Sequence, residues 1–214
     1  CTFLVFDIMR IFITGGAGFI GIHLCKKLLE LNHDVTVYDN FSNSLQENFT
    51  SIIKQKVTLI FGDILDYSKL VTSMKNHNIV IHLAAKISVP ESIKNPKLTF
   101  DVNVNGTQNV LNACLQNDIT KIIAASTAAV YQNTSTKIIL DEASPVGPQS
   151  PYGESKLEME NKIIDFTSIH NIDATILRFF NVFGIGQSLE YAGVVTKFKE
   201  NIQNNCPLVI LGDG

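Results

Sequence analysis

The chain has 214 residues, 45% of them hydrophobic and 17% charged, and its formal net charge is −3. These values are typical of a globular protein, and the length allows one large domain or one domain plus part of another. The negative charge argues against nucleic-acid binding, and no apolar stretch approaches the ~20 residues that span a bilayer. Four cysteines without a C-x-x-C pair argue against disulfides and a zinc site, so we expect a cytoplasmic protein without metal.

The first eight residues are apolar but have no basic flank, so they do not resemble a signal peptide. Met9 comes directly before the first predicted strand. We therefore expect Cys1–Ile8 to be a non-native or disordered extension, and residues 9–214 to form the folded part.

Apolar runs alternate with helical patterns along the rest of the chain. The predicted strands are Arg10–Ile13, Asp34–Tyr38, Val57–Phe61, Ile79–Leu83, Lys121–Ala125, Ala174–Arg178 and Leu208–Leu211. The predicted helices are one carrying Ile20, Leu24, Leu28 and Leu31, and then Tyr67–Lys75, Pro96–Gln116, Pro151–Ile169 and Val194–Gln203. Because the strands are apolar without alternation, they predict an α/β fold with a doubly wound, mostly parallel sheet. Ligands of such sheets bind at the carboxyl ends of the strands.

A glycine-rich segment follows the first strand directly. Residues Thr14–Gly21 read T-G-G-A-G-F-I-G, in which Gly16, Gly18 and Gly21 satisfy G-x-G-x-x-G. Gly15, Gly18 and Gly21 also satisfy the wider G-x-x-G-x-x-G spacing. Such glycines permit a tight turn and let backbone N–H groups approach a pyrophosphate at a helix N-terminus. The segment predicts a dinucleotide site, although glycine-rich turns also occur as plain strand–helix connections.

An acidic residue at the end of the second strand supports a dinucleotide site. Asp39 follows the run Asp34–Tyr38, about 20 residues beyond the glycine motif. A carboxylate there can accept both ribose hydroxyls and repels a 2′-phosphate. This position therefore favours NAD over NADP, and the alternative is a surface aspartate that begins a turn.

A tyrosine and a lysine with helical spacing suggest proton transfer. Tyr152 and Lys156 form Y-x-x-x-K, and with Pro151 as the first helical residue they lie on one helical face. A nearby ammonium favours the phenolate and makes tyrosine a better base. Thr127, at the end of the fifth strand, offers a hydroxyl that can hold a substrate and pass a proton to Tyr152. The alternative for Thr127 is a cap on the chain after the strand.

Eight ordered motifs carry a family resemblance. They are T-G-G-A-G-F-I-G, Asp39-Asn40, Gly62-Asp63-Ile64, His82-Leu83-Ala84-Ala85, Asn103-Val104-Asn105-Gly106-Thr107, Ser126-Thr127-Ala128-Ala129-Val130-Tyr131, Ser150-Pro151-Tyr152-Gly153-Glu154-Ser155-Lys156 and Leu177-Arg178-Phe179-Phe180-Asn181. Together they resemble the NAD-dependent epimerase/dehydratase group of the extended short-chain dehydrogenase/reductases. The chain is most similar to the members that epimerise nucleotide sugars at C4.

The resemblance implies a role for the residues at the corresponding positions, and among them Lys86 departs from the Gln or Gly that members of the group often have. Cofactor contacts fall on Gly15, Gly18, Phe19, Ile20, Asp39, Asn40, Asp63, Ile64, Leu83, Ala84, Ala85, Lys86, Asn103, Tyr152, Lys156 and Phe180. Thr127, Tyr152 and Lys156 match the catalytic positions, and Thr127, Tyr152 and Asn181 match substrate contacts. The implied partners are NAD and a UDP-sugar or another nucleotide sugar, with a homodimer for the full-length protein.

Two positions after Thr127 distinguish reactions within the group. Related 4,6-dehydratases place Asp-Glu there, whereas this chain has Ala128-Ala129. Elimination of water needs an acid and a base beyond the tyrosine, and epimerisation needs neither. The sequence therefore favours C4 epimerisation, with a nucleotide-sugar dehydratase or decarboxylase as alternatives. A non-catalytic NAD-binding sensor or inactive fragment is the alternative from another class.

The sequence ends at Gly212-Asp213-Gly214, directly after the last predicted strand. Members of the group continue through a segment that clamps the nucleotide of the substrate. We expect residues 9–214 to hold the NAD-binding Rossmann domain, the catalytic helix and the start of the substrate-binding region. The C-terminal substrate domain is expected to be largely missing.

Overall fold

The computed structural model describes residues 8–44, 49, 57–133, 139–187 and 194–208. The strands are β1 (Arg10–Thr14), β2 (Asp34–Asp39), β3 (Thr58–Phe61), β4 (Ile79–His82), β5 (Lys121–Thr127) and β6 (Asp173–Phe179). The α-helices are α1 (Phe19–Glu30), α3 (Tyr67–Ser73), α4 (Val89–Lys94), α5 (Pro96–Phe100), α6 (Gly106–Gln116), α7 (Pro151–His170) and α8 (Val194–Gln203). A π-helical segment, η1 (Asp101–Asn105), joins α5 to α6, and a 3-10 turn, η2 (Ala128–Val130), follows β5.

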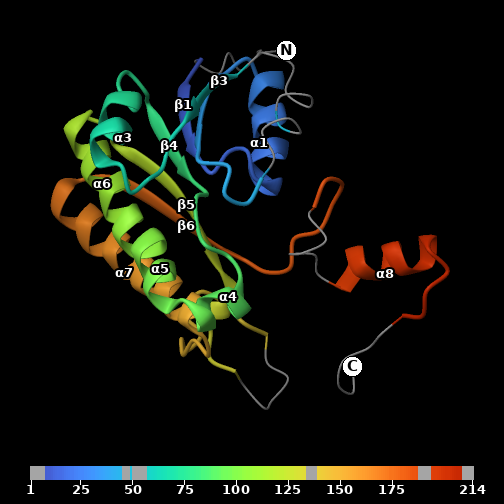
Figure 1. Cartoon of the computed structure of the whole chain (residues 1–214). Coiled ribbons are helices and arrows are strands. Elements are labelled where there is room, and N and C mark those ends of the chain that lie inside the picture. The colour runs from blue at the N-terminus through green and yellow to red at the C-terminus, as the bar shows by residue number, and fades with distance from the viewer. Residues whose placement is uncertain (1–7, 45–48, 50–56, 134–138, 188–193, 209–214) are drawn as a thin grey trace, which may run out of the picture. The chain divides into compact units, whose positions relative to one another are not determined.

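The six strands form one parallel sheet of order β3-β2-β1-β4-β5-β6 (Figure 1). The strand order reverses after β3, because β4 pairs with the other side of β1. This topology confirms the predicted doubly wound, mostly parallel sheet. The carboxyl ends of all six strands consequently lie at one edge, where the sequence places its candidate ligand-binding residues.

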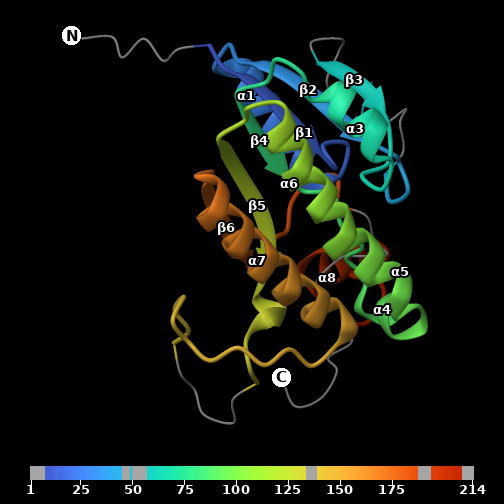
Figure 2. The same ribbon diagram turned by 90° about the vertical axis from the view of Figure 1, so that its left-hand side faces the viewer.

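Two apolar cores pack on opposite faces of the sheet. Phe12 of β1 points into a core built with α3, α6 and α7, whereas its neighbours Ile11 and Ile13 point into a core with Cys25 of α1. Alternate residues of a strand face opposite sides, so a fully apolar strand fits a sheet covered on both faces. Figure 2 shows α6 and α7 side by side on the first of these faces, and the two helices contact each other.

The connection between β4 and α6 differs from the sequence prediction. A single helix was predicted over Pro96–Gln116, but the structure has the π-helical segment η1 between α5 and α6. The Thr107 hydroxyl donates to the Asn103 carbonyl at 2.6 Å, and such a bond to the carbonyl four residues earlier often bends a helix. Helix α4 was not predicted at all, although Ser88 caps it by accepting from Glu91 N.

Residues Phe179–Gly214 form a second compact unit, of which the structure describes 179–187 and 194–208. Helix α8 has the predicted bounds. The predicted strand Leu208–Leu211 is not observed at Leu208, and residues 209–211 lie outside the described part. Among the described helices none is both long and apolar enough to cross a membrane.

Candidate active site

The glycine loop after β1 packs against the loop after β4. Gly15 has φ +69°, and a Cβ built there would lie 2.5 Å from the backbone nitrogen of Ala84. Only glycine combines that left-handed conformation with such a close approach. Gly18 begins α1 as its N-cap and offers no capping side chain, so the first N–H groups of the helix remain open to an anion. The loop has the form predicted for a pyrophosphate site.

Asp39 ties the end of β2 to the glycine loop. Its Oδ2 accepts a hydrogen bond from Ala17 N at 3.0 Å, and its Oδ1 accepts one from Phe41 N at 2.8 Å. Burial raises the pKa of Asp39, and these two backbone N–H groups counteract the shift. Each carboxylate oxygen keeps a lone pair, since an ionised carboxylate offers about four acceptor sites. The carboxylate therefore holds the loop and still has capacity for ribose hydroxyls.

Asn40 and Asp63 join the ends of β2 and β3. Asn40 Nδ2 donates to Asp63 Oδ2 at 2.8 Å, and Asp63 Oδ1 accepts from Leu65 N at 2.8 Å. The next residue, Ile64, is 4% exposed and packs closely against Gly106 at the start of α6. These predicted cofactor contacts are thus adjacent, and the side chains of Asn40 and Asp63 are paired with one another.

A buried polar chain fixes the end of β4. His82 accepts from Thr14 Oγ1 at its Nδ1 (2.6 Å), and its Nε2 lies 2.9 Å from Thr107 Oγ1. The Thr107 hydroxyl donates to a carbonyl, so Nε2 must carry the proton that this hydroxyl accepts. Burial lowers the pKa of His82 to about 3, with a smaller contribution from the Lys156 charge. His82 is therefore a neutral structural residue that holds the end of β4, directly before Leu83–Lys86.

Asn103, in η1, uses its side-chain amide within the protein. Its Oδ1 accepts from Lys86 N at 2.8 Å, and its Nδ2 donates to Lys86 O at 3.0 Å and to Ser155 Oγ at 2.9 Å. Ser155 Oγ in turn donates to Tyr152 O at 2.7 Å. Asn103 therefore links the predicted cofactor segment after β4 to the first turn of α7.

Thr127, Tyr152 and Lys156 lie where β5 ends and α7 begins. Burial raises the pKa of Tyr152, and a side-chain hydrogen bond with Thr127 opposes the increase. Lys156 is 4% exposed, and burial lowers its pKa to about 8. Its Nζ lies 3.1 Å from Met159 Sδ. The Thr127 and Tyr152 hydroxyls are thus in contact. Thr127 Oγ1 also accepts from Ala129 N at 3.1 Å, so Thr127 caps the turn after β5 as well.

Comparisons with known proteins agree with this geometry. The model of the NAD dependent epimerase/dehydratase family matches residues 11–214. The chain belongs to this family. It is 39% identical over 178 residues to the UDP-glucose 4-epimerase of Halalkalibacterium halodurans, an alignment that covers 82% of the chain and 52% of the relative.

Two solved structures of the family show the same fold. A UDP-N-acetylglucosamine 4-epimerase from Methanobrevibacter ruminantium, in complex with UDP-N-acetylmuramic acid, has a TM-score of 0.90 at 34% identity, with 98% of this chain and 67% of that chain covered. DesIV, a dTDP-glucose 4,6-dehydratase from Streptomyces venezuelae with NAD bound, has a TM-score of 0.87 at 28% identity and coverages of 96% and 66%. This family member therefore spans about half to two thirds of the proteins it resembles.

The residues present fit the dinucleotide for which the family is named. Three groups lie together at the carboxyl ends of β1 and β2. They are Gly15, where close backbone packing admits only glycine, the uncapped N-terminus of α1 and the Asp39 carboxylate. A helix N-terminus is complementary to phosphates, and a carboxylate is complementary to ribose hydroxyls. Among the described residues of this family member, no group of three or more His, Cys, Asp or Glu side chains could hold a metal ion.

Sequence reasoning missed residues that hold helix α7. Ser92 of α4 accepts from Tyr152 N at 3.1 Å and donates to Val89 O at 2.7 Å. Ser92 is fully buried, and only prediction of the short helix α4 could have pointed to it. Gly153 belongs to a motif named above, and the structure shows that it is close to the protein's own backbone, since a Cβ there would lie 2.6 Å from Ala129 O. Glu160 was detectable, since it follows Lys156 at the same helical spacing that separates Lys156 from Tyr152.

The predicted contacts Phe180 and Asn181 belong to the second unit. They follow β6 directly, both are exposed, and the exposed fraction of Phe180 is 61%. Their roles toward the cofactor and the sugar nucleotide remain predictions, as does the homodimer.

Proposed function

We propose that this chain binds NAD and carries the catalytic residues of a nucleotide-sugar 4-epimerase similar to UDP-glucose 4-epimerase. The observation that carries the proposal is the hydrogen-bonded Thr127–Tyr152 pair beside the buried Lys156, at the edge of the sheet that holds the glycine loop. Its substrate is a UDP-sugar or a related nucleotide sugar. The similarity to a UDP-sugar complex and to an NAD complex supports both ligands.

NAD, when bound, supplies a centre that accepts hydride from C4 of the sugar and returns it. Thr127 holds the C4 hydroxyl and passes its proton to Tyr152, which acts as the general base. For the return step Tyr152 gives the proton back, so the residue ends each turnover in its starting state. Between the removal and the return of hydride, the 4-keto sugar rotates in the site and thereby exposes its other face.

The electrostatics explain why the tyrosine needs support. Burial alone raises the pKa of Tyr152 and so opposes its action as a base at neutral pH. The Thr127 hydroxyl lowers that pKa by hydrogen bonding, and a protonated Lys156 would do the same through its charge. With a pKa of about 8, Lys156 is still mostly protonated at neutral pH.

A 4,6-dehydratase is the second candidate, favoured by the similarity to DesIV. Dehydration needs a further acid and base beside the tyrosine. In this chain the turn η2 after Thr127 begins with Ala128 and Ala129, which have no ionisable side chain. We therefore favour epimerisation over dehydration.

The experiment is an assay of a protein containing this chain with a panel of UDP-sugars. We expect it to prefer NAD to NADP, to interconvert C4 epimers and to release no net NADH. Accumulation of a 4-keto-6-deoxy sugar would instead assign the dehydratase. Bound NAD without any turnover would identify a non-catalytic NAD-binding protein.

A further inference from the structure

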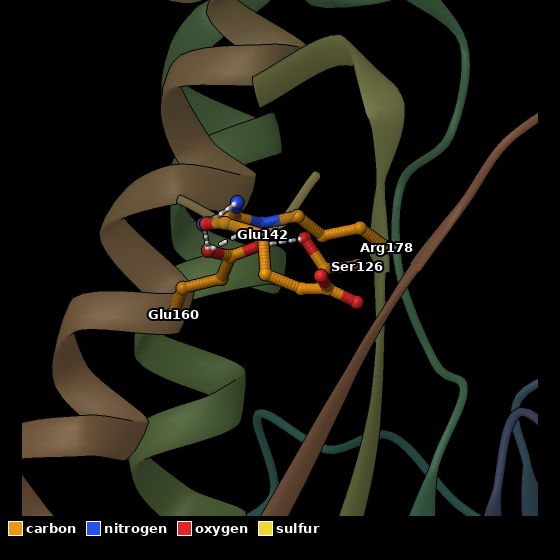
Figure 3. Close-up of polar contacts among 4 residues, drawn as sticks. All are labelled: Ser126, Glu142, Glu160 and Arg178. Atoms are coloured by element: carbon orange, nitrogen blue, oxygen red, sulfur yellow. Dashed lines mark hydrogen bonds and ion pairs between the residues drawn. The ribbon is translucent and has the colours of Figure 1, made fainter. Parts of the chain in front are cut away.

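A buried carboxylate, Glu160, is the centre of a cluster of polar contacts with Ser126 and Arg178 (Figure 3). Glu160 of α7 is 2% exposed, and its Oε2 accepts from Arg178 Nη2 at 2.7 Å. Arg178 Nε, on β6, donates to both carboxylate oxygens at 3.1 and 3.2 Å. Ser126 Oγ, on β5, donates to Glu160 Oε1. One carboxylate thus connects the catalytic helix to two neighbouring strands.

Arg178 extends the cluster to the loop between β5 and α7. Its Nη1 donates to Glu142 O at 3.3 Å, and its guanidinium carbon lies 4.9 Å from the ring centre of Tyr131. Hydrogen bonding to Glu160 raises the pKa of Arg178 further, so the guanidinium stays charged. The same charge pair therefore contacts this loop at two points, Tyr131 at its start and Glu142 near its middle.

Two contacts fasten α7 to the segment that carries Thr127. Near the start of the helix, Gly153 packs directly against Ala129 O. Two turns later, Glu160 bonds to Ser126. The two contacts are seven residues apart along α7 and three residues apart along the segment formed by the end of β5 and the turn η2.

We propose that Glu160, held by Arg178 and bonded to Ser126, is a positioning residue that sets the register of α7 along β5. Thr127 lies between the two contacts on one segment and Lys156 between them on the other, while Tyr152 adjoins Gly153. The Ser126 contact therefore determines whether the Thr127 hydroxyl reaches the Tyr152 phenol. The role of Glu160 in catalysis rests on the proposed function, whereas its effect on the Thr127–Tyr152 hydrogen bond does not.

Ser126→Ala tests the proposal, because it removes the contact with β5 and leaves the Glu160–Arg178 charge pair intact. The readout is the phenolate absorbance of Tyr152 in the 214-residue chain without added cofactor, obtained by subtracting the titration of a Tyr152→Phe twin. The Thr127 hydrogen bond lowers the pKa of Tyr152. Its loss should raise the midpoint by about half a pH unit or more.

Ser168→Ala is the matched control, because Ser168 is exposed on the same helix and bonds only locally, to Asp165 O. It should leave the midpoint unchanged. If Ser126→Ala does not fold, Ser126→Cys keeps nearly the same size with a much weaker donor, and Ser168→Cys serves as its control. An unchanged or lowered midpoint in the folded Ser126 variant would overturn the proposal.

Turnover gives a second measure in a protein that contains the chain. Ser126→Ala should lower kcat roughly three- to tenfold per NAD-loaded molecule, with KM for the sugar nucleotide within about twofold. A fall confined to KM contradicts a positioning role. Failure of the proposed function would be distinguishable, since the unmodified protein would then bind no NAD or convert no UDP-sugar, whatever the Tyr152 titration shows.

Discussion

The two halves of the candidate site are built by different means. At the ends of β1 and β2, glycines let backbone segments touch, as where Gly15 meets Ala84, and Asp39 bonds to backbone N–H groups. At the end of β5, the site depends on charged side chains that are almost fully buried, Lys156 and Glu160. The first half, the cofactor half, is shaped by backbone geometry. The second half, which contains the proposed catalytic residues and is called the catalytic half, is shaped by side-chain partners from distant segments.

This difference predicts how each half responds to mutation. A backbone-shaped site fails when a side chain is added, because the clash is with main-chain atoms that cannot move away. A site of buried charges fails when a partner is removed, because an uncompensated charge or an unmet hydrogen bond remains. No buried side-chain nitrogen or oxygen within the described ranges lacks a partner, so removal of one partner takes a hydrogen bond away from the other.

The largest effect is expected in the catalytic half, from Tyr152→Phe. The variant removes the phenol that we propose as the base and keeps the ring. Turnover should fall about 100-fold or more, the usual worth of general base catalysis, with little change in NAD affinity. Kinetics with a UDP-sugar and calorimetry with NAD measure the two effects. Near-normal turnover would mean that another group is the base.

Gly15→Ala should disrupt the packing of the glycine loop in the cofactor half. The left-handed conformation costs a non-glycine residue about 1–2 kcal/mol, and the clash with Ala84 N adds to it, so NAD affinity should fall about tenfold or more. Gly186→Ala is the control, because Gly186 also has a positive φ, +87°, but nothing lies within 4 Å of its would-be Cβ. Titration of both variants with NAD measures the two affinities. Equal affinities would show that Gly15 does not shape the site.

Asp39→Asn probes the carboxylate at the end of β2. The variant keeps the size of the side chain but turns an acceptor into a donor that faces Ala17 N or Phe41 N. NAD affinity should fall several-fold to about tenfold, and the preference over NADP should narrow, because a charged hydrogen bond and a repulsion are both lost. Asp34→Asn, at the exposed start of β2, is the control. Equal binding of NAD and NADP by the unmodified chain would refute the role of Asp39.

The cofactor half was largely predictable from sequence because its constraints are local. Gly15 and Gly18 occur within one loop, and Asp39 follows an apolar run whose end is visible. The predicted strands agree with the observed ones to within about two residues at each end up to β6. Local spacing also predicted α7, since Ser150 accepts from Gly153 N at 3.2 Å and Pro151 begins the helix.

The catalytic half was predictable only as far as helical spacing reaches. Tyr152 and Lys156 are four residues apart, and this spacing places them on one face. In contrast, Ser92 lies 60 residues from Tyr152, and Asn103 lies 52 residues from Ser155. Such pairs form only when the sheet and α7 bring distant segments together. The π-helical segment was missed for the same reason, since Asn103 has partners in two other segments.

The smallest effect tests the cost of the buried ammonium. Lys156→Met keeps the length of the side chain and removes the charge, so the variant should be more stable than the unmodified chain at pH 7, by about 1 kcal/mol. Burial lowers the pKa of Lys156 from its ordinary 10.5 to about 8. Between these values the unfolded chain binds more protons than the folded chain, so the stability of the unmodified chain rises relative to the variant as the pH increases. Denaturant unfolding from pH 7 to pH 10 should show the difference in unfolding free energy between variant and unmodified chain shrinking above about pH 8.

Lys27→Met, at a side chain 67% exposed, controls for the loss of one positive charge. A difference that stays constant over this range would mean that Lys156 holds its proton throughout, and that burial of an ammonium is not what distinguishes this half of the site.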